Sequence, residues 1–314
     1  CYNYFMNNHE LLANLAQDFY FLQLSLSELS EKYHLSRYLV NKYLEDARKE
    51  GIVTITISSP IERSFELEKQ FKTLFDIPQI YIIKDVEDGN SESLIKFAAK
   101  RIESHILNSQ TVGTVWGETI FRIIDHFTPQ EHSDLLFTQM MGENRKYHSA
   151  AGSMRMVEKA AKQFSAQYVT LSGPLYITNP AVRKGMTEEI ASQPAFTTAK
   201  RMDLIFSGLG TLASVNSIPI WEQHTNEIFP DINLGAIAGM AYGRPYDING
   251  NILVTPENDC VFGVDMKTIF QPPKRVGVVK SKFKTQATLG ALRGKFFTEL
   301  IISESIAERI LAEL

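Results

Sequence analysis

Apolar and polar positions in the N-terminal part of the chain follow the pattern of three short helices. Between residues 10 and 22 the apolar side chains recur about every 3.6 residues, which predicts a helix with one buried face. Ser25, with a glutamate three positions later, carries the signature of a capping box and predicts the start of a second helix. Ser36 has the position of an N-cap for a third helix, which we expect to end at Gly51. Strict alternation from Ile52 to Ser58 then predicts a strand.

Two short helices joined by a tight turn and followed by a strand are the elements of a winged helix-turn-helix. In that motif the N-terminal end of the last helix enters the major groove of DNA. The residues at this end offer groups that bind phosphates or base edges: Ser36, Arg37, Tyr38, Asn41 and Lys42. We therefore predict a winged helix-turn-helix DNA-binding domain over residues 1–59. The alternative is a small helical packing module with an ordinary solvated face, which would not need the strand.

The pattern changes twice after Pro60. Residues 61–75 carry apolar side chains at near-helical spacing and predict a linker helix within residues 60–77, which either packs on the next domain or pairs two subunits. From residue 78 to residue 314, short apolar runs alternate with amphipathic stretches, which predicts a Rossmann-like α/β domain with a mostly parallel sheet covered on both faces. The expected strands are Ile80–Ile83, Thr111–Trp116, Leu135–Met141, Tyr168–Leu171, Leu204–Phe206, Arg275–Val279 and Phe297–Ile302. The expected helices are Leu94–Leu107, Thr119–Phe127, Ser153–Phe164, Lys284–Leu292 and Ser303–Leu314.

Composition adds limits to this picture. A chain of 314 residues is long enough for two domains, and none of its apolar runs approaches the roughly 20 residues that cross a bilayer. We expect a cytoplasmic protein without a membrane span, because the N-terminus also lacks a secretory signal. The formal net charge of −4 does not favour a nucleic-acid binder as a whole. Locally, however, the stretch from Ser36 to Lys49 has more basic than acidic residues.

Glycine-containing turns follow four of the predicted strands. They are Gly117-Glu118-Thr119, Gly142-Glu143-Asn144, Ser172-Gly173-Pro174 and Ser207-Gly208-Leu209-Gly210. Ligands of open α/β sheets bind at the carboxyl ends of strands, so these turns predict a shared pocket. The first turn leads directly into a helix, whose N-terminal amides and Thr119 hydroxyl could bind an anion. The alternative for each single turn is that glycine only reverses the chain. Lys280, Lys282 and Lys284 alternate near another strand end, so one of them could point into the pocket.

Sequence motifs for turnover are lacking. The spacing of Gly208 and Gly210 formally fits a dinucleotide fingerprint, but Pro219 would cut the following helix short, and the motif lies late in the domain. The histidines show no metal-binding spacing, Cys1 and Cys260 match neither a metal nor a redox motif, and no catalytic triad can be assigned. Asp247 lies in the loop YDINGN, where an aspartate is more often a turn residue than a ligand contact. We expect no metal, no cofactor and no catalytic residue.

These segments together resemble the SorC family of bacterial sugar-binding transcriptional regulators. The resemblance rests on LSLSELSEKYHLSRYLVNKYLEDARKEGIVTITI near the N-terminus, and on VGTVWGET, LLFTQMMG, LSGPLYI, FSGLGTL, YDINGN, ENDCVFGV and RVGVVKSKFKTQATLGALRGKFFTELIISESIAERIL downstream. It implies an effector domain similar to the phosphosugar isomerase and deaminase superfamily, and a dimer or tetramer on operator DNA. Met140, Met240, Cys260 and the Lys280-Ser281 pair depart from the family pattern.

The resemblance also implies an effector, a sugar or a sugar phosphate, that changes operator affinity. The residues expected to bind it are Gly117, Thr119, Gly142, Gly208, Gly210 and Lys284, with Asp247 nearby and Glu143 in the second turn. Lys284 matches the lysine that meets the phosphate of the ligand. The predicted function is therefore a DNA-binding regulator of carbohydrate metabolism. The alternative is a sugar-phosphate isomerase or deaminase with an N-terminal assembly domain, in which Glu118, Glu143 and Asp247 are the candidate general bases.

Overall fold

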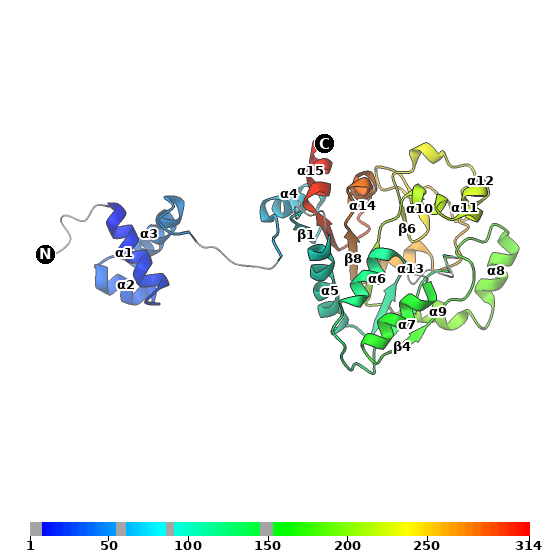
Figure 1. The fold of residues 1–314 in the computed structure, drawn as a ribbon, viewed down its shortest axis with the longest axis horizontal. Helices are drawn as coiled ribbons and strands as arrows, with labels where there is room; N and C mark the ends of the chain where they lie inside the picture. The colour runs from blue at the N-terminus through cyan, green and yellow to red at the C-terminus, as the bar shows by residue number, and fades with distance from the viewer. Residues whose placement is uncertain (1–7, 55–60, 86–90, 145–152) are drawn as a thin grey trace. The chain divides into compact units, whose positions relative to one another are not determined.

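The protein is described by a computed structural model that covers residues 8–54, 61–85, 91–144 and 153–314 (Figure 1). Contacts divide the chain into two compact units, Cys1–Ser59 and Pro60–Leu314, called here the N-terminal unit and the C-terminal unit. None of the described helices is both long and apolar enough to cross a bilayer.

The N-terminal unit consists of three helices, α1 (Asn8–Tyr20), α2 (Leu26–Tyr33) and α3 (Arg37–Lys49). The predicted capping box is present, because the Ser25 hydroxyl accepts the Glu28 amide at 3.3 Å and the Glu28 carboxylate accepts the Ser25 amide at 2.7 Å. The Ser36 hydroxyl likewise accepts an amide of α3, at 3.3 Å. A small apolar core lies between the helices, formed by Leu12, Leu15, Ala16, Leu29, Val40, Leu44 and Ala47.

The strand expected from Ile52 to Ser58 is not formed by its first three residues. The amide of Val53 donates to the Ala47 carbonyl at 3.0 Å and so completes the end of α3 instead of pairing in a sheet. The side chains of Ile52 and Val53 pack against the three-helix core, which explains their apolar character without a strand. Residues 55–58 lie outside the described part of the chain, so the expected wing is not tested there.

The C-terminal unit contains a parallel sheet in the order β1-β9-β8-β5-β2-β3-β4. Its strands are β1 (Gln79–Ile83), β2 (Thr111–Thr114), β3 (Leu136–Gln139), β4 (Gln167–Val169), β5 (Leu204–Gly208), β8 (Lys274–Val279) and β9 (Glu299–Ser303). Each of the seven expected strands appears within a few residues of its expected place. Short apolar runs predicted them well because parallel strands are buried on both faces.

Helices α5 (Glu92–Ile106), α6 (Glu118–Asp125) and α7 (Ser153–Gln163) lie side by side (Figure 1). They lead from β1 to β2, from β2 to β3 and from β3 to β4, always in the same direction across the sheet. After β4 the chain runs back through β5, β8 and β9, so its direction reverses between β2 and β5. Because crossovers between parallel strands are right-handed, the helices of the returning half cover the opposite face. The expected two-sided α/β domain is thus confirmed.

Helices α14 (Thr285–Arg293) and α15 (Glu304–Ala312) of this unit were also expected from the sequence, whereas α8 (Pro180–Glu188) and a set of shorter elements were not. The latter are α9 (Gln193–Ala199), α10 (Leu212–Asn216), α11 (Pro219–Gln223), α12 (Thr225–Ile228), α13 (Met266–Phe270), the 3₁₀ turns η1 (Leu234–Ala236) and η2 (Lys282–Lys284), and an antiparallel hairpin of β6 (Gly239–Ala241) and β7 (Arg244–Tyr246). Most are shorter than two helical turns, so they show no usable periodicity.

Helix α4 (Phe65–Phe75) belongs to the C-terminal unit and packs against β1. Of the two arrangements expected for the linker helix, packing on the α/β domain or pairing of two subunits, the structure contains the first. Its Phe71 side chain is fully buried. Glu68 is also buried, and it accepts two hydrogen bonds from Arg63, at 2.9 and 2.6 Å, and one from the Ile82 amide at 3.0 Å. Arg63 forms an antiparallel bridge with Ile83, so the segment before α4 covers the outer edge of β1.

Candidate effector-binding site

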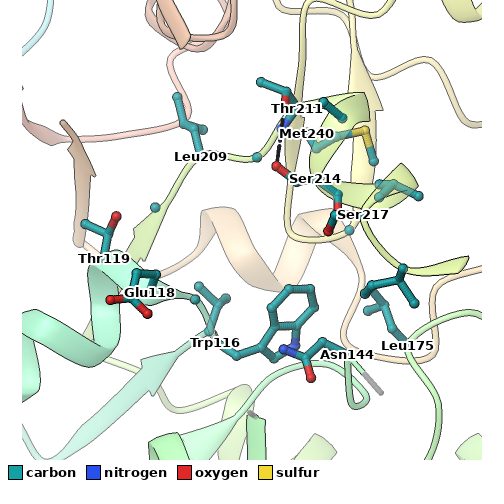
Figure 2. Close-up of a pocket in the computed structure, with 18 of the residues that line it drawn as sticks. Trp116, Glu118, Thr119, Asn144, Leu175, Leu209, Thr211, Ser214, Ser217 and Met240 are labelled. Atoms are coloured by element: carbon teal, nitrogen blue, oxygen red, sulfur yellow. Dashed lines mark hydrogen bonds between the residues drawn. The ribbon is translucent and has the colours of Figure 1, made fainter. Parts of the chain in front are cut away.

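A cavity of about 550 Å³ opens at the carboxyl ends of β2 and β5, where the chain direction reverses (Figure 2). This is the position at which open α/β sheets bind ligands, and the volume falls within the range of about 300–1,000 Å³ typical of small-molecule sites. Five of the predicted effector-binding residues line it: Gly117, Thr119, Gly208, Gly210 and Lys284. The structure therefore brings together residues that are up to 167 positions apart in sequence, from Gly117 to Lys284.

The first wall is the turn between β2 and α6. Gly117 has φ 147° and ψ 156°, a conformation that is essentially restricted to glycine. It is the N-cap residue of α6, and no side chain caps this helix. Glu118 and Thr119 follow at the cavity edge (Figure 2). The amide end of α6 and the Thr119 hydroxyl thus offer hydrogen-bond donors to an anion, while the Glu118 carboxylate offers acceptors.

The second wall follows β5. Gly210 pairs with Met240 of β6 through two backbone hydrogen bonds, at 2.9 and 3.0 Å. A Cβ atom on Gly210 would lie 3.2 Å from the Met240 Cβ, so glycine permits this close approach. Thr211 then begins α10, where its amide donates to the Ser214 hydroxyl at 3.3 Å (Figure 2). Helix α10 has only five residues, and Pro219 starts the next helix, so the long helix that a dinucleotide fingerprint requires is not formed here.

Lys284 supplies a cation to the same cavity. Its ammonium group donates to the Leu209 carbonyl, which fixes it beside the turn after β5. Burial, and to a lesser extent the charge of Lys280, lower the pKa of Lys284 from its ordinary value. Of the three alternating lysines, only Lys284 lines the cavity, whereas Lys282 is exposed and its ammonium lies 6.0 Å from the centre of the Phe283 ring.

Aromatic side chains form a third wall, which the sequence did not indicate. The ring of Trp221 lies 6.4 Å from that of Trp116 and 5.0 Å from that of Tyr176, centre to centre. Trp116 lies two residues after the end of β2, whereas Tyr176 lies in the loop after β4 and Trp221 on α11. The residues Leu175, Ser214, Ser217, Ile218 and Met240 also line the cavity. Most of these come from the short elements without periodicity, and only their nearness to glycine turns was a signal.

Gly142 and Glu143 do not reach the cavity surface, although their neighbours Met141 and Asn144 do. A Cβ on Gly142 would lie 2.6 Å from the Pro174 carbonyl oxygen, so this glycine allows two loops to pack closely. The Glu143 backbone pairs with the same loop, donating to Gly173 at 2.7 Å and accepting from Leu175 at 2.9 Å. The second turn therefore supports the wall from behind.

Asp247 also lies outside the residues that line the cavity, and its expected place near the effector stays a prediction. Its carboxylate accepts the amides of Asn249 and Asn251 at 2.9 and 2.8 Å and the Asn251 side-chain amide at 3.0 Å. Although partial burial would raise the pKa of Asp247, these hydrogen bonds lower it from its ordinary value. Asp247 thus stabilises its own turn, the commoner of its two interpretations.

The predicted DNA-binding residues lie at the start of α3. Ser36 caps the helix through its hydroxyl, and Arg37, Tyr38, Asn41 and Lys42 are exposed to solvent, with Tyr38 at 77%. Their role in DNA binding stays a prediction. Among the described residues, no group of three His, Cys, Asp or Glu side chains could hold a metal ion.

The chain is similar to known proteins in both sequence and structure. Residues 59–312 match the Sugar-bind family, described as "Putative sugar-binding domain". The chain is 21% identical to the sorbitol operon regulator of Klebsiella pneumoniae, over 96% of this chain and 97% of that protein, and 24% identical to the transcriptional regulator YjhU of Escherichia coli, over 92% and 90%. The crystal structure of the full-length sorbitol operon regulator superposes with a TM-score of 0.71 at 20% identity, covering 98% of this chain and all of that one. The chain therefore belongs to the SorC family of sugar-binding transcriptional regulators.

Proposed function

We propose that the protein regulates carbohydrate genes by binding operator DNA with residues 1–59 and a phosphorylated sugar in the cavity of residues 78–314, with residues 60–77 as the link between them. The observation that carries the effector part is the joint presence of Lys284, the uncapped start of α6 and the Thr119 hydroxyl around one cavity. A cation and helix N-terminal amides are the groups that hold phosphate, and hydroxyl side chains suit a sugar. The name of one relative, the sorbitol operon regulator, supports control of a sugar operon.

Effector control requires that the ligand bind one DNA-binding state more tightly than another. We propose that a sugar phosphate changes operator affinity about 5–150-fold, the range of ordinary allosteric coupling. The full-length protein would first select its DNA site from a random library, and the affinity for that site would then be titrated with and without glucose 6-phosphate, ribose 5-phosphate and their unphosphorylated sugars. If no phosphate changes DNA affinity or melting temperature, the effector proposal is wrong.

Lys284→Ala tests the phosphate contact within this assay. It removes the cation that the described residues place at the cavity, and it should abolish the response to phosphates while leaving DNA affinity without ligand unchanged. Lys282→Ala is the matched control, because Lys282 belongs to the same turn but is exposed and does not line the cavity.

DNA contact by the N-terminal unit is tested separately. Arg37→Ala and Lys42→Ala each remove an exposed cation from the start of α3, so affinity should fall and its salt dependence should become weaker. Lys69→Ala, which changes an exposed lysine of α4, is the control with the same loss of charge. Unchanged affinity in both N-terminal variants would show that this surface does not read DNA. We also propose that two or four copies act together, because one mildly basic unit should bind weakly.

We propose binding without turnover. Of the three acids suggested as general bases, only Glu118 lines the cavity. The Glu143 backbone pairs with the loop at Gly173, and the Asp247 carboxylate accepts hydrogen bonds within its own turn. The Glu118 carboxylate can accept hydrogen bonds from sugar hydroxyls, so its place at the cavity is explained by ligand binding without a role in proton transfer. Incubation of the purified protein with pentose, hexose and amino-hexose phosphates, followed by product analysis, tests this proposal. An isomerised sugar phosphate, or a deaminated product with released ammonia from the amino-hexose phosphate, that disappears in Glu118→Gln would contradict it.

A further inference from the structure

The cavity has two chemically different ends. Figure 2 shows Glu118 and Thr119 on one side and Leu175 on the other, with Trp116 between them. The first side, together with Lys284, presents charge and hydrogen-bonding groups. The other side is built mainly from Trp116, Leu175, Tyr176, Ile218 and Trp221, called here the apolar wall, with the smaller polar side chains of Asn144, Ser214 and Ser217 beside it (Figure 2).

The polar atoms of two rings in the apolar wall are already occupied by the protein backbone. The Trp116 indole N–H donates to the Gly142 carbonyl at 3.2 Å, and the Tyr176 hydroxyl donates to the Gly243 carbonyl at 2.8 Å. These bonds fix the two rings and use the donors that a polyhydroxylated ligand would need. What these residues offer to a ligand is therefore ring and hydrocarbon surface.

Met240 extends this apolar surface toward the turn after β5. It lines the cavity and is held in place by the two backbone hydrogen bonds to Gly210. A thioether is polarisable and packs well against aromatic rings. Most of the apolar wall is packed in the protein, since Leu175, Tyr176, Ile218 and Trp221 are only 1–9% exposed, so it presents to a ligand just the ring and hydrocarbon surface that faces the cavity. A free sugar phosphate on the polar side would not cover this surface, and covering it with an apolar group is favourable in proportion to the area buried.

We propose that the effector is a phosphorylated glycoside with an aromatic aglycone, whose ring packs on the apolar wall while its phosphate lies at Lys284 and the start of α6. This inference rests on the proposed function, since it assigns the sugar phosphate to the polar side. The aromatic group adds what the wall lacks, a flat apolar partner for Trp116, Tyr176 and Trp221.

The test compares matched ligands by isothermal titration with the full-length protein. For glucose, galactose and ribose, the phosphorylated sugar is compared with its phenyl glycoside carrying the same phosphate. We expect at least one phenyl glycoside phosphate to bind about tenfold tighter or better than the sugar phosphate without the ring, a gain of about 1.4 kcal/mol. Equal affinity within every pair, or weaker binding of the phenyl compounds, overturns this inference but leaves the proposed function intact. If no phosphate binds at all, both are overturned.

Variants locate the aromatic group. Trp221→Leu should remove most of the advantage of the phenyl compound while affinity for the plain sugar phosphate is kept, whereas Phe283→Leu, which changes an aromatic residue that is 84% exposed, should leave the advantage unchanged. Trp116→Leu provides a second position if Trp221→Leu fails to fold. Persistence of the full advantage in a folded variant of either tryptophan would show that the ring binds elsewhere and overturn the assignment.

Discussion

The two units differ in how their candidate sites relate to secondary structure. In the N-terminal unit the exposed residues proposed to contact DNA all lie on or beside α3, so one helical register sets all of them. The cavity of the C-terminal unit is assembled from the ends of β2 and β5, from α10 and α11, and from the start of α14. A site on one helix depends on that helix alone, whereas a site of many loops depends on the whole sheet that positions them.

The same difference appears in the cores. Seven buried apolar residues hold the N-terminal unit together, and its helix caps and the Asp18 hydrogen bonds to Lys32 and Tyr33, both 2.6 Å, supplement them. The C-terminal unit has an extended apolar core along its seven-stranded sheet. Each core can therefore be weakened without touching the other, and the two activities should separate.

The largest effects are expected from core truncations. Leu44→Ala removes a buried side chain from the small core, and Phe71→Ala removes a fully buried ring from the larger one, each at about 3–5 kcal/mol. Leu44→Ala should abolish DNA binding while ligand binding survives, because the cavity lies entirely in the C-terminal unit. Phe71→Ala should lower the melting temperature of the C-terminal unit. Calorimetry and ligand titration check this separation, and loss of ligand binding in Leu44→Ala would contradict the independence of the two units.

The next effect concerns a buried charge at the start of β9. Glu299 is 1% exposed and accepts hydrogen bonds from Arg101, at 2.8 and 3.2 Å, and from His105 at 2.9 Å. Burial alone would raise the pKa of Glu299, but the hydrogen bonds from His105 and Arg101 outweigh it and lower the pKa below its ordinary value of 4.5. Glu299→Ala should cost about 3 kcal/mol, because it leaves two donors without their acceptor in a largely buried place.

The pH dependence of the Glu299 cluster follows from the same shift. A carboxyl group with a lowered pKa contributes stability that is fully present above its unfolded pKa and is lost as the pH falls through the folded one. Urea unfolding of the C-terminal unit between pH 7 and pH 3 should therefore show a loss in the wild type that is smaller in Glu299→Ala. Glu308→Ala, an exposed glutamate on α15, is the control. Parallel pH profiles of the wild type and Glu299→Ala would show that the cluster does not stabilise the fold.

The difference between the two units also explains which features of the fold and of the cavity the sequence predicted. The helix caps at Ser25 and Ser36 and the apolar runs of the sheet are local signals, and the structure contains all of them. Gly117, Gly208 and Gly210 were found because strand ends converge in this fold. Trp221 was missed, since its place in the cavity depends on the path of α10 and α11, which no periodicity reveals. The resemblance suggested Asp247 near the effector, but a resemblance carries over a residue type without its hydrogen bonds, and in the structure these bonds close the turn of Asp247 itself.

A smaller effect, on both stability and ligand binding, is expected from substitution of Gly117 at the edge of the cavity. Its φ of 147° disfavours any side chain, although a Cβ there would meet no atom within 4 Å. Gly117→Ala should therefore cost about 1–3 kcal/mol through backbone strain alone and weaken sugar phosphate binding by displacing the start of α6. Gly185→Ala is the matched control, because Gly185 lies in α8 with equally open space and without a positive φ, where alanine is favoured. Equal stability of the two variants would show that the turn relaxes without strain.

The smallest expected effect separates capping from DNA contact within the N-terminal unit. Ser25→Ala and Ser36→Ala each remove an N-cap hydroxyl and should cost about 1 kcal/mol of stability. Ser25 caps α2, whereas Ser36 lies at the end of α3 that is proposed to enter the major groove. At a temperature well below unfolding, Ser25→Ala should leave DNA affinity unchanged while Ser36→Ala lowers it, and chemical unfolding together with DNA titration measures both. An equal loss of affinity in the two variants would mean that stability, and not the position of the serine at the start of α3, limits DNA binding.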